Sequence, residues 1–243
     1  MPQTPTPQQQ AVIEQTEGPH LVIAGPGSGK TFTLVERIVH LVTEKEVLPE
    51  SLLVATFTEK AAGELISRII RRLLEHNVVA NVSAMYVGTL HSICLRILEE
   101  RREYTRLKKN FTLMDQFDQT YFIYQRLNEF EELAPLTLLM GREAVSRWNK
   151  ALNLCAWLNK LSEECIEASA LQGDEDEAVQ ALGKWYARYL VLLEEENLLD
   201  FSVVQLETVR LLEAYPDTVL TELRQQFQYI LIDEYQETNT VQE

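Results

Sequence analysis

The sequence has 243 residues, of which 46% are hydrophobic and 24% are charged, so one large globular domain or two ordinary ones are expected. No apolar run approaches the ~20 residues of a membrane span, and residues 1–7 have neither the basic nor the apolar region of a signal peptide, which favours a cytoplasmic protein without a membrane partner. Three cysteines without CxxC spacing argue against a disulfide or zinc framework, and the net charge of −15 argues by itself against a nucleic-acid binder.

Short apolar runs alternate with amphipathic segments along the first ninety residues. Buried strands are expected at 20–24, 52–56 and 85–88, and helices at 31–43, 61–76 and 91–102. Strands that alternate with helices in this way indicate an α/β fold with a parallel sheet.

The pattern becomes mainly helical from about residue 115 to residue 225. Helices are expected at 118–130, 143–161, 177–193 and 201–214, with Trp148, Trp157 and Trp185 packed in their core. A strand returns at 229–232. The sequence therefore predicts a discontinuous α/β core, residues 1–90 and 225–243, with an all-helical subdomain inserted at 91–224.

The charge is distributed unevenly. Residues 60–110 carry ten Lys and Arg against five Glu, whereas residues 111–243 carry nine against twenty-five Asp and Glu. Phosphate binding depends on local clustering of cations, so the basic stretch is either a nucleic-acid surface or a set of solvated helix faces.

One segment matches the phosphate-binding loop [AG]xxxxGK[ST] and lies between a predicted strand and a predicted helix, as that motif requires. Glycines let the backbone N–H groups surround phosphates at a helix N-terminus. Lys30 is expected to reach the β- and γ-phosphates of a nucleotide, and the Thr31 hydroxyl to bind Mg²⁺. The loop reads Ala24-Gly25-Pro26-Gly27-Ser28-Gly29-Lys30-Thr31.

Two carboxylates, Asp233 and Glu234, follow the last predicted strand. Ligands of open α/β sheets bind at the carboxyl ends of the strands, so Asp233 is expected to hold Mg²⁺ and Glu234 to polarise an attacking water. The pair alone is a weak signal, but together with the loop at Lys30 it predicts an incomplete RecA-like P-loop NTPase sheet.

In these motifs the chain resembles the N-terminal part of UvrD/Rep-type superfamily 1 DNA helicases. Residues 6–12 resemble the family's Q motif, 24–31 motif I, 56–65 motif Ia, 88–92 motif Ib and 233–239 motif II. Asp200-Phe201 resembles a DFxxL element. Motif II, DEYQETN here, is the most specific match.

The resemblance implies the roles of further residues. Gln9 would read the adenine edge, and Gln236 would join Lys30 and Glu234 in catalysis. The single-stranded DNA path would be lined by Phe57, Thr58, Lys60 and His91. For Phe57 the alternative is core packing beneath its loop, and for His91 it is capping of its helix. The implied ligands are ATP, Mg²⁺ and single-stranded DNA at a duplex junction, in a bacterial cytosol.

The sequence also departs from the family pattern. Phe32 stands where Arg commonly packs on the adenine, Leu90 where Phe is usual, and Glu237 where Asp is usual. The chain ends nine residues after Glu234, before motifs III to VI and the second RecA-like domain, whose arginines contribute ~10³–10⁵ in phosphoryl-transfer rate. The chain is therefore expected to be a fragment with little hydrolysis of its own.

The resemblance implies an ATP-dependent 3′→5′ DNA helicase, with a role such as DNA repair, in the intact protein. Three alternatives stay open at this stage. The chain could be the ATPase half of a helicase–nuclease, a P-loop ATPase that does not unwind DNA, or a binding module without enzymatic activity.

Overall fold

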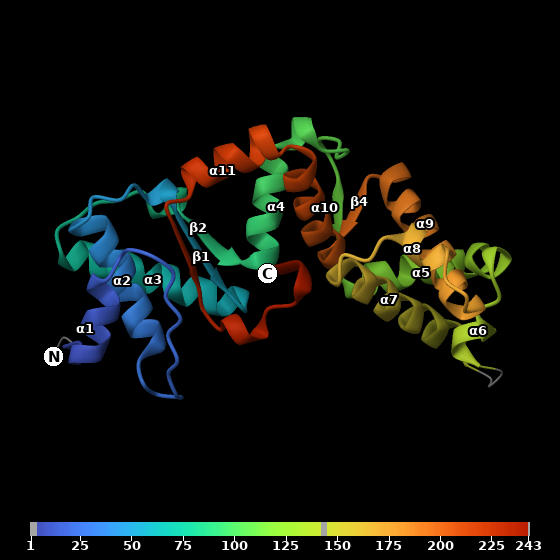
Figure 1. Ribbon diagram of the computed structural model, residues 1–243, viewed down its shortest axis with the longest axis horizontal. Coiled ribbons are helices and arrows are strands. Elements are labelled where there is room, and N and C mark those ends of the chain that lie inside the picture. Colours follow the sequence, from blue (N-terminus) through green and yellow to red (C-terminus); the bar gives the residue numbers. More distant parts are fainter. Residues whose placement is uncertain (1–3, 142–144, 243) are drawn as a thin grey trace. The chain divides into compact units, whose positions relative to one another are not determined.

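The computed structural model describes residues 4–141 and 145–242. Two compact units make up the chain: Met1–Ile93 with Leu220–Glu237, and Cys94–Val219 with Thr238–Glu243 (Figure 1). Residues from Thr238 onward thus cluster with the second unit, whereas the sequence placed them with the first. The assignment of the units as a nucleotide-binding core and an inserted subdomain remains a prediction.

The first unit contains a three-stranded parallel sheet in the order β2 (Tyr86–Thr89), β1 (Leu52–Thr56), β5 (Tyr229–Ile232). Val54 in the central strand is opposite Val87 on one side and Leu231 on the other. Every residue of β1 is buried, which explains its uninterrupted apolar sequence. These three strands confirm the predicted parallel α/β sheet.

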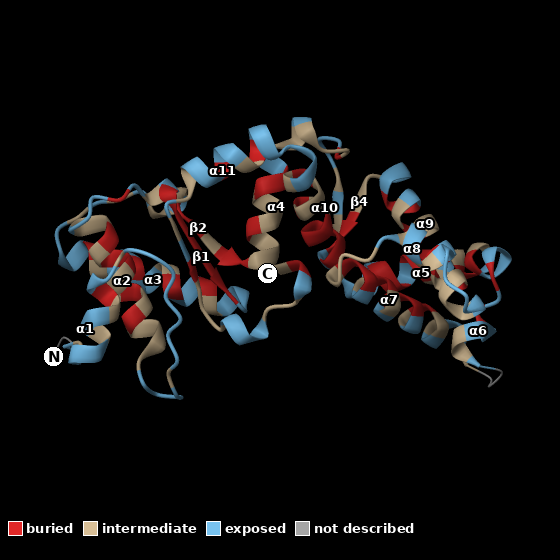
Figure 2. Cartoon of the chain, in the orientation of Figure 1, coloured by how far each residue is buried: buried red, intermediate tan, exposed pale blue. Residues whose placement is uncertain are grey.

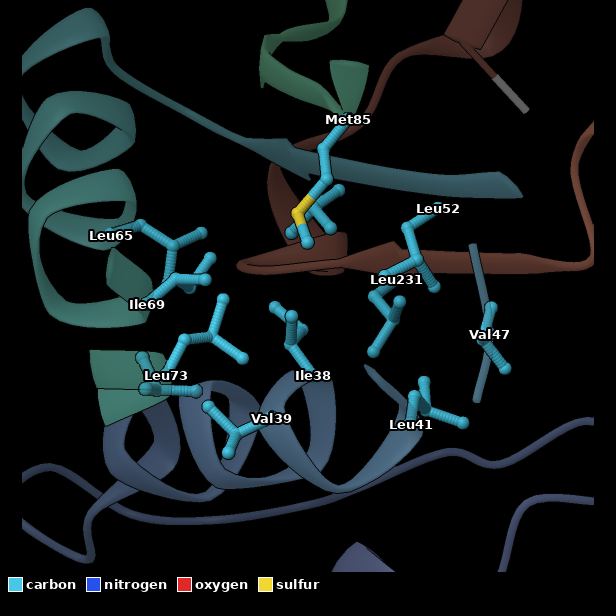
Figure 3. Packing of buried hydrophobic residues seen from close by; sticks show 12 residues of the cluster. Ile38, Val39, Leu41, Val47, Leu52, Leu65, Ile69, Leu73, Met85 and Leu231 are labelled. Atoms are coloured by element: carbon cyan, nitrogen blue, oxygen red, sulfur yellow. The ribbon is translucent and has the colours of Figure 1, made fainter. Parts of the chain in front are cut away.

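Helices of the first unit are α1 (Pro7–Glu14), α2 (Lys30–Thr43), α3 (Glu59–Glu75) and α11 (Thr221–Gln226), and α4 (Leu90–Glu100) begins in it. The apolar faces of α2 and α3 pack together and against the sheet (Figure 3). Their shared core consists of Val35, Ile38, Val39, Leu41, Val47, Leu52, Val54, Leu65, Ile69, Leu73, Met85 and Leu231.

The strand predicted at residues 20–24 is wrong for this structure. The segment has no regular structure, and Leu21 and Ile23 are 78% and 91% exposed. The N–H and C=O groups of a strand need hydrogen-bond partners on a neighbouring strand. Within the described residues, the sheet of the first unit consists of β2, β1 and β5 alone. The core of the first unit contains none of the side chains of residues 20–24.

The second unit is built mainly from helices, as predicted. The long ones are α5 (Gln116–Leu133), α7 (Arg147–Glu163), α9 (Glu177–Glu195) and α10 (Phe201–Ala214), with short α6 (Thr137–Met140) and α8 (Ala168–Gln172) between them. The predicted start of the second helix, Glu143, lies outside the described residues. A π-helix occupies Pro216–Leu220.

The expectation of an all-helical insertion is corrected by a parallel pair of short strands. β3 (Thr112–Met114) pairs with β4 (Leu198–Asp200), with Leu113 opposite Leu199. Three residues give too short a pattern to be read from hydrophobic periodicity. Burial differs along the helices (Figure 2), and of the three tryptophans expected in the core only Trp185 is fully buried.

A buried carboxylate connects β4 to three helices. Asp200 is 2% exposed and caps α10, with its Oδ1 accepting the N–H of Val203 at 2.8 Å. Its Oδ2 accepts the hydroxyl of Tyr189 at 2.5 Å and the amide of Gln119 at 3.2 Å. Burial raises the pKa of Asp200, and the hydrogen bond from Tyr189 acts against that rise. The DFxxL element therefore begins at a cap that organises the unit's core.

Among the described residues, no helix combines the length and the apolar character that crossing a bilayer requires.

Candidate functional site

The glycine-rich loop forms a tight turn immediately before α2. The N–H and the hydroxyl of Ser28 both bond to the carbonyl of Gly25, at 3.3 and 2.6 Å. Gly27 and Gly29 have φ angles of 74° and 86°, in the left-handed region that side chains rarely adopt. The loop conformation thus depends on glycine at these two positions.

Gln9 ties this loop to α1. Its Oε1 accepts the N–H of Thr6 at 2.8 Å, which completes a capping box, and its Nε2 donates to the carbonyl of Ser28 at 2.9 Å. A Cβ at Gly29 would lie 2.8 Å from that nitrogen. The structure therefore brings Gln9 against the phosphate-binding loop, while its expected contact with adenine remains a prediction.

The N-terminus of α2 fits a phosphate. Gly29 is the N-cap, and no side chain caps the helix among the residues described. The first-turn N–H groups, on Lys30, Thr31 and Phe32, point out of the helix end and carry its partial positive charge. An anion at this position would supply the acceptors that capping side chains supply elsewhere.

Asp233 and Glu234 lie where β5 ends, and Glu234 reaches the phosphate-binding loop. The N–H of Asp233 donates to the carbonyl of Ala55 at 2.8 Å, which continues the ladder with β1. Glu234, with a left-handed φ of 55°, accepts the Lys30 ammonium at 3.1 Å and the amide of Gln236. The structure thus brings together all three residues predicted to be catalytic.

The two carboxyl groups have shifted pKa values in opposite directions. Hydrogen bonds from Gln236 and then Lys30 lower the pKa of Glu234. Partial burial, followed by the neighbouring charge of Glu234, raises the pKa of Asp233. A Thr hydroxyl and a carboxylate are the hard oxygen ligands that Mg²⁺ prefers, so Thr31 and Asp233 are chemically suited to the expected metal.

The residues predicted to line the DNA path follow the carboxyl ends of β1 and β2. Phe57 is 61% exposed, so the alternative of core packing beneath the loop is wrong. Thr58 caps α3 by accepting the N–H of Ala61 at 3.1 Å, and Lys60 is exposed. His91 is half-buried in the first turn of α4. Their contacts with DNA remain a prediction.

A polar link between these two strand ends was not predicted from the sequence. The hydroxyl of Thr89, at the end of β2, donates to Glu59 at 2.7 Å and accepts the N–H of Ser92 at 3.2 Å. A Cβ at Gly88 would lie 2.3 Å from the Ser92 hydroxyl. A larger residue at position 88 would therefore displace the Ser92 hydroxyl from its present place. The hydrogen bonds of Thr89 connect the two segments that are predicted to contact DNA.

Arg37 is a second residue that the sequence analysis missed. Its guanidinium donates to the carbonyls of Val12 and Gln15, at the end of α1. Burial lowers its pKa. The sequence signal for Arg37 was a cation beside the apolar residues of α2. In the structure, its guanidinium donates hydrogen bonds to carbonyl groups at the end of α1, where a helix cannot supply partners of its own.

The basic stretch at 60–110 is partly neutralised within the fold. Carboxylates pair with at least four of its ten cations: Arg68 with Glu64, Arg72 with Glu36, Arg96 with Glu100 and Arg106 with Glu207. The stretch is also divided between the two units. Its local excess of positive charge is therefore weak support for a DNA surface.

Comparison with known proteins assigns the family. A protein-family model for the UvrD/REP helicase N-terminal domain matches residues 5–243. The chain is 34% identical over 235 residues to the ATP-dependent DNA helicase PcrA of Staphylococcus epidermidis strain RP62A, and 34% identical over 236 residues to that of Staphylococcus aureus strain NCTC 8325. Each match covers 97% of this chain and 30% of the relative. Because the family model covers nearly the whole chain, this protein belongs to the UvrD/REP helicase family and carries its N-terminal domain.

Proposed function

We propose that this chain is the ATP-binding part of an ATP-dependent DNA helicase that moves along single-stranded DNA. The observation that carries the proposal is the convergence of Lys30, Glu234 and Gln236 beside an uncapped helix N-terminus. The relatives that this chain resembles are named as ATP-dependent DNA helicases, and the chain spans 30% of their length.

The loop from Ala24 to Gly29 would hold the phosphates through its backbone N–H groups, and Phe32 would stack on the base that Gln9 recognises. Thr31 and Asp233 would hold Mg²⁺, which neutralises charge on the phosphate oxygens when bound. Lys30 would have to leave Glu234 to reach the β- and γ-phosphates. Nucleotide binding therefore replaces an ion pair that already exists in the chain.

Release from Lys30 would leave Glu234 free to orient the attacking water and accept its proton. Gln236, which donates to the same carboxylate, would hold it in place during this step. An acceptor of that proton must be ionised, and the hydrogen bond from Gln236, which lowers the pKa of Glu234, favours its ionised form.

Single-stranded DNA would cross the edge where β1 and β2 end. The exposed ring of Phe57 offers a base-stacking surface, which unpaired bases can use and paired bases cannot. Thr58, Lys60 and His91 would contact the same strand. In the intact cytoplasmic protein, ATP turnover would drive translocation along this strand with 3′→5′ polarity and open the duplex at its junction.

A titration with a fluorescent ATP analogue and Mg²⁺ tests the proposal. Lys30→Ala should abolish binding, since the loop loses its only side-chain cation, whereas Lys45→Ala removes an exposed lysine just after α2 and should change nothing. Undiminished binding by the Lys30→Ala variant would refute the nucleotide site.

A further inference from the structure

A row of aromatic side chains lies on one face of α5 in the second unit. Phe117, Tyr121 and Tyr124 are spaced by four and three residues, which places them on the same side of the helix. A different face of α5 supplies the core residues Gln119, Thr120, Phe122, Ile123, Leu127 and Phe130. The aromatic row is therefore additional to what holds the helix in its unit.

The rings of this row are nearly parallel and evenly spaced. Phe117 and Tyr121 have an interplanar angle of 4° with centroids 6.3 Å apart, and Tyr121 and Tyr124 have 13° with the same separation. Trp148 of the adjacent α7 lies 5.7 Å from both Phe117 and Tyr124. The near-parallel rings at regular intervals thus form one array along this face of α5.

The outer part of the row is open to water. Phe117 is 64% exposed and Tyr121 is 47% exposed, while Tyr124 and Trp148 are half-buried. Neighbouring exposed aromatic rings are uncommon on a surface without a binding role, because their apolar area is more favourably covered. Packing between α5 and α7 explains the positions of the half-buried rings, Tyr124 and Trp148. It does not explain the exposed rings of Phe117 and Tyr121.

The charges around the row favour an anionic ligand. Arg147 lies 5.3 Å from the centroid of the Tyr124 ring and donates to Asn128 at 2.9 Å, which fixes a cation at one end of the row. Lys150 follows one turn later on α7. Asp118 is the sole carboxylate in the sequence from Phe117 to Asn128, in a chain of net charge −15.

We propose that the row Phe117, Tyr121, Tyr124 and Trp148, with Arg147, is a platform for unpaired bases of single-stranded nucleic acid. Flat rings in near-parallel array match the faces of bases, and the adjacent cations match the phosphates. The platform is separate from the DNA residues proposed in the first unit and needs no nucleotide. Its binding should therefore survive Lys30→Ala.

Fluorescence anisotropy of a labelled oligothymidylate of about 16 nucleotides, with the full chain and no ATP, tests the platform. Removing one ring by Phe117→Ala or Tyr121→Ala should weaken binding about ten-fold, and the double variant more. Phe117→Leu, which keeps apolar bulk without a ring face, should weaken it nearly as much as Phe117→Ala. Val191→Ala, at a 43% exposed apolar site in the same unit, should have no effect.

Three results would overturn the platform. One is undetectable binding by the wild-type chain, and another is equal affinity for a blunt duplex, whose bases have no free faces. The third is wild-type affinity in the double variant with circular dichroism unchanged. If Phe57→Ala lost binding of the oligothymidylate and the double variant did not, DNA binding would be assigned to the first unit alone. Failure of Lys30→Ala to affect nucleotide binding would leave the platform untouched, so the two proposals fail separately.

Discussion

The Lys30 ammonium lies 3.1 and 3.3 Å from the two carboxylate oxygens of Glu234, which is 204 residues later in the chain. Lys30 is expected to bind phosphate and Glu234 to orient water, so in this structure the two functional side chains neutralise each other's charge. Both side chains are partly exposed to water, so the pair contributes little to stability. An incoming phosphate can displace such a pair.

Glu234→Gln should tighten binding of an ATP analogue by the chain, because Lys30 loses its competing carboxylate. The gain in affinity should be at most about five-fold, because an ion pair that is exposed to water is weak. Titration at low salt checks the change. Glu237→Gln removes an exposed carboxylate from the same segment and serves as the control. An equal gain in affinity in that variant would show that the effect comes from the loss of any negative charge, not from release of Lys30.

Gly29→Ala should lower the free energy of unfolding by about 1–2 kcal/mol, the cost of a left-handed conformation for a residue with a Cβ. The added atom would also lie 2.8 Å from Nε2 of Gln9 and disturb its bond to Ser28. Urea denaturation measures the loss. Gly25→Ala is the matched control, since its φ is not left-handed and open space surrounds its Cβ position; a similar loss there would remove the argument.

Arg72→Ala should cost more stability than Arg68→Ala on the same helix. Arg72 binds Glu36 through two hydrogen bonds at 2.6 and 2.7 Å, and both side chains are largely buried. Arg68 and Glu64 are 44% and 55% exposed. Breaking the largely buried pair is expected to cost about 1–2 kcal/mol, and breaking the exposed pair under about 0.5 kcal/mol. Equal urea midpoints for the two variants would contradict this ranking.

Much of the fold could be predicted because its signals are local. Residues 52–56, 201–214 and 229–232 have the predicted bounds, since each is a continuous apolar or amphipathic run ended by a polar residue or a turn. The convergence of Lys30 and Glu234 was also predictable, because two motifs of known order imply it.

The remaining features depend on contacts distant in sequence. Residues 20–24 have the composition of a strand, but a strand exists only beside a partner, and composition does not show one. The hydrogen bond between Glu59 and Thr89 likewise joins two separate motifs through the fold. A count of charged residues likewise does not show which cations of residues 60–110 form ion pairs with carboxylates.

Ile23→Ser tests whether residues 20–24 are exposed to water, as the structure shows, or form a buried strand. The side chain is 91% exposed, so the change should alter the free energy of unfolding by less than about 0.5 kcal/mol. Val54→Ser, in the fully buried central strand, should cost about 2 kcal/mol or more. A large loss from Ile23→Ser in urea denaturation would show that residues 20–24 are packed in solution.

The three cysteines should differ sharply in reactivity. Burial raises the pKa of Cys94 and of Cys155 to about 11, and burial also raises that of Cys165, though less. The thiolate is the reactive form, so at pH 8 a thiol with a pKa of 11 is only about one part in a thousand ionised, against roughly a quarter for an unperturbed thiol. Iodoacetamide should therefore label Cys165 first, and raising the pH should accelerate the labelling of the other two about ten-fold per unit. Peptide mass spectrometry reads each site, with urea-unfolded chain as the control. Labelling of Cys155 in the folded chain at the rate of Cys165 would show that its helix, α7, does not stay packed.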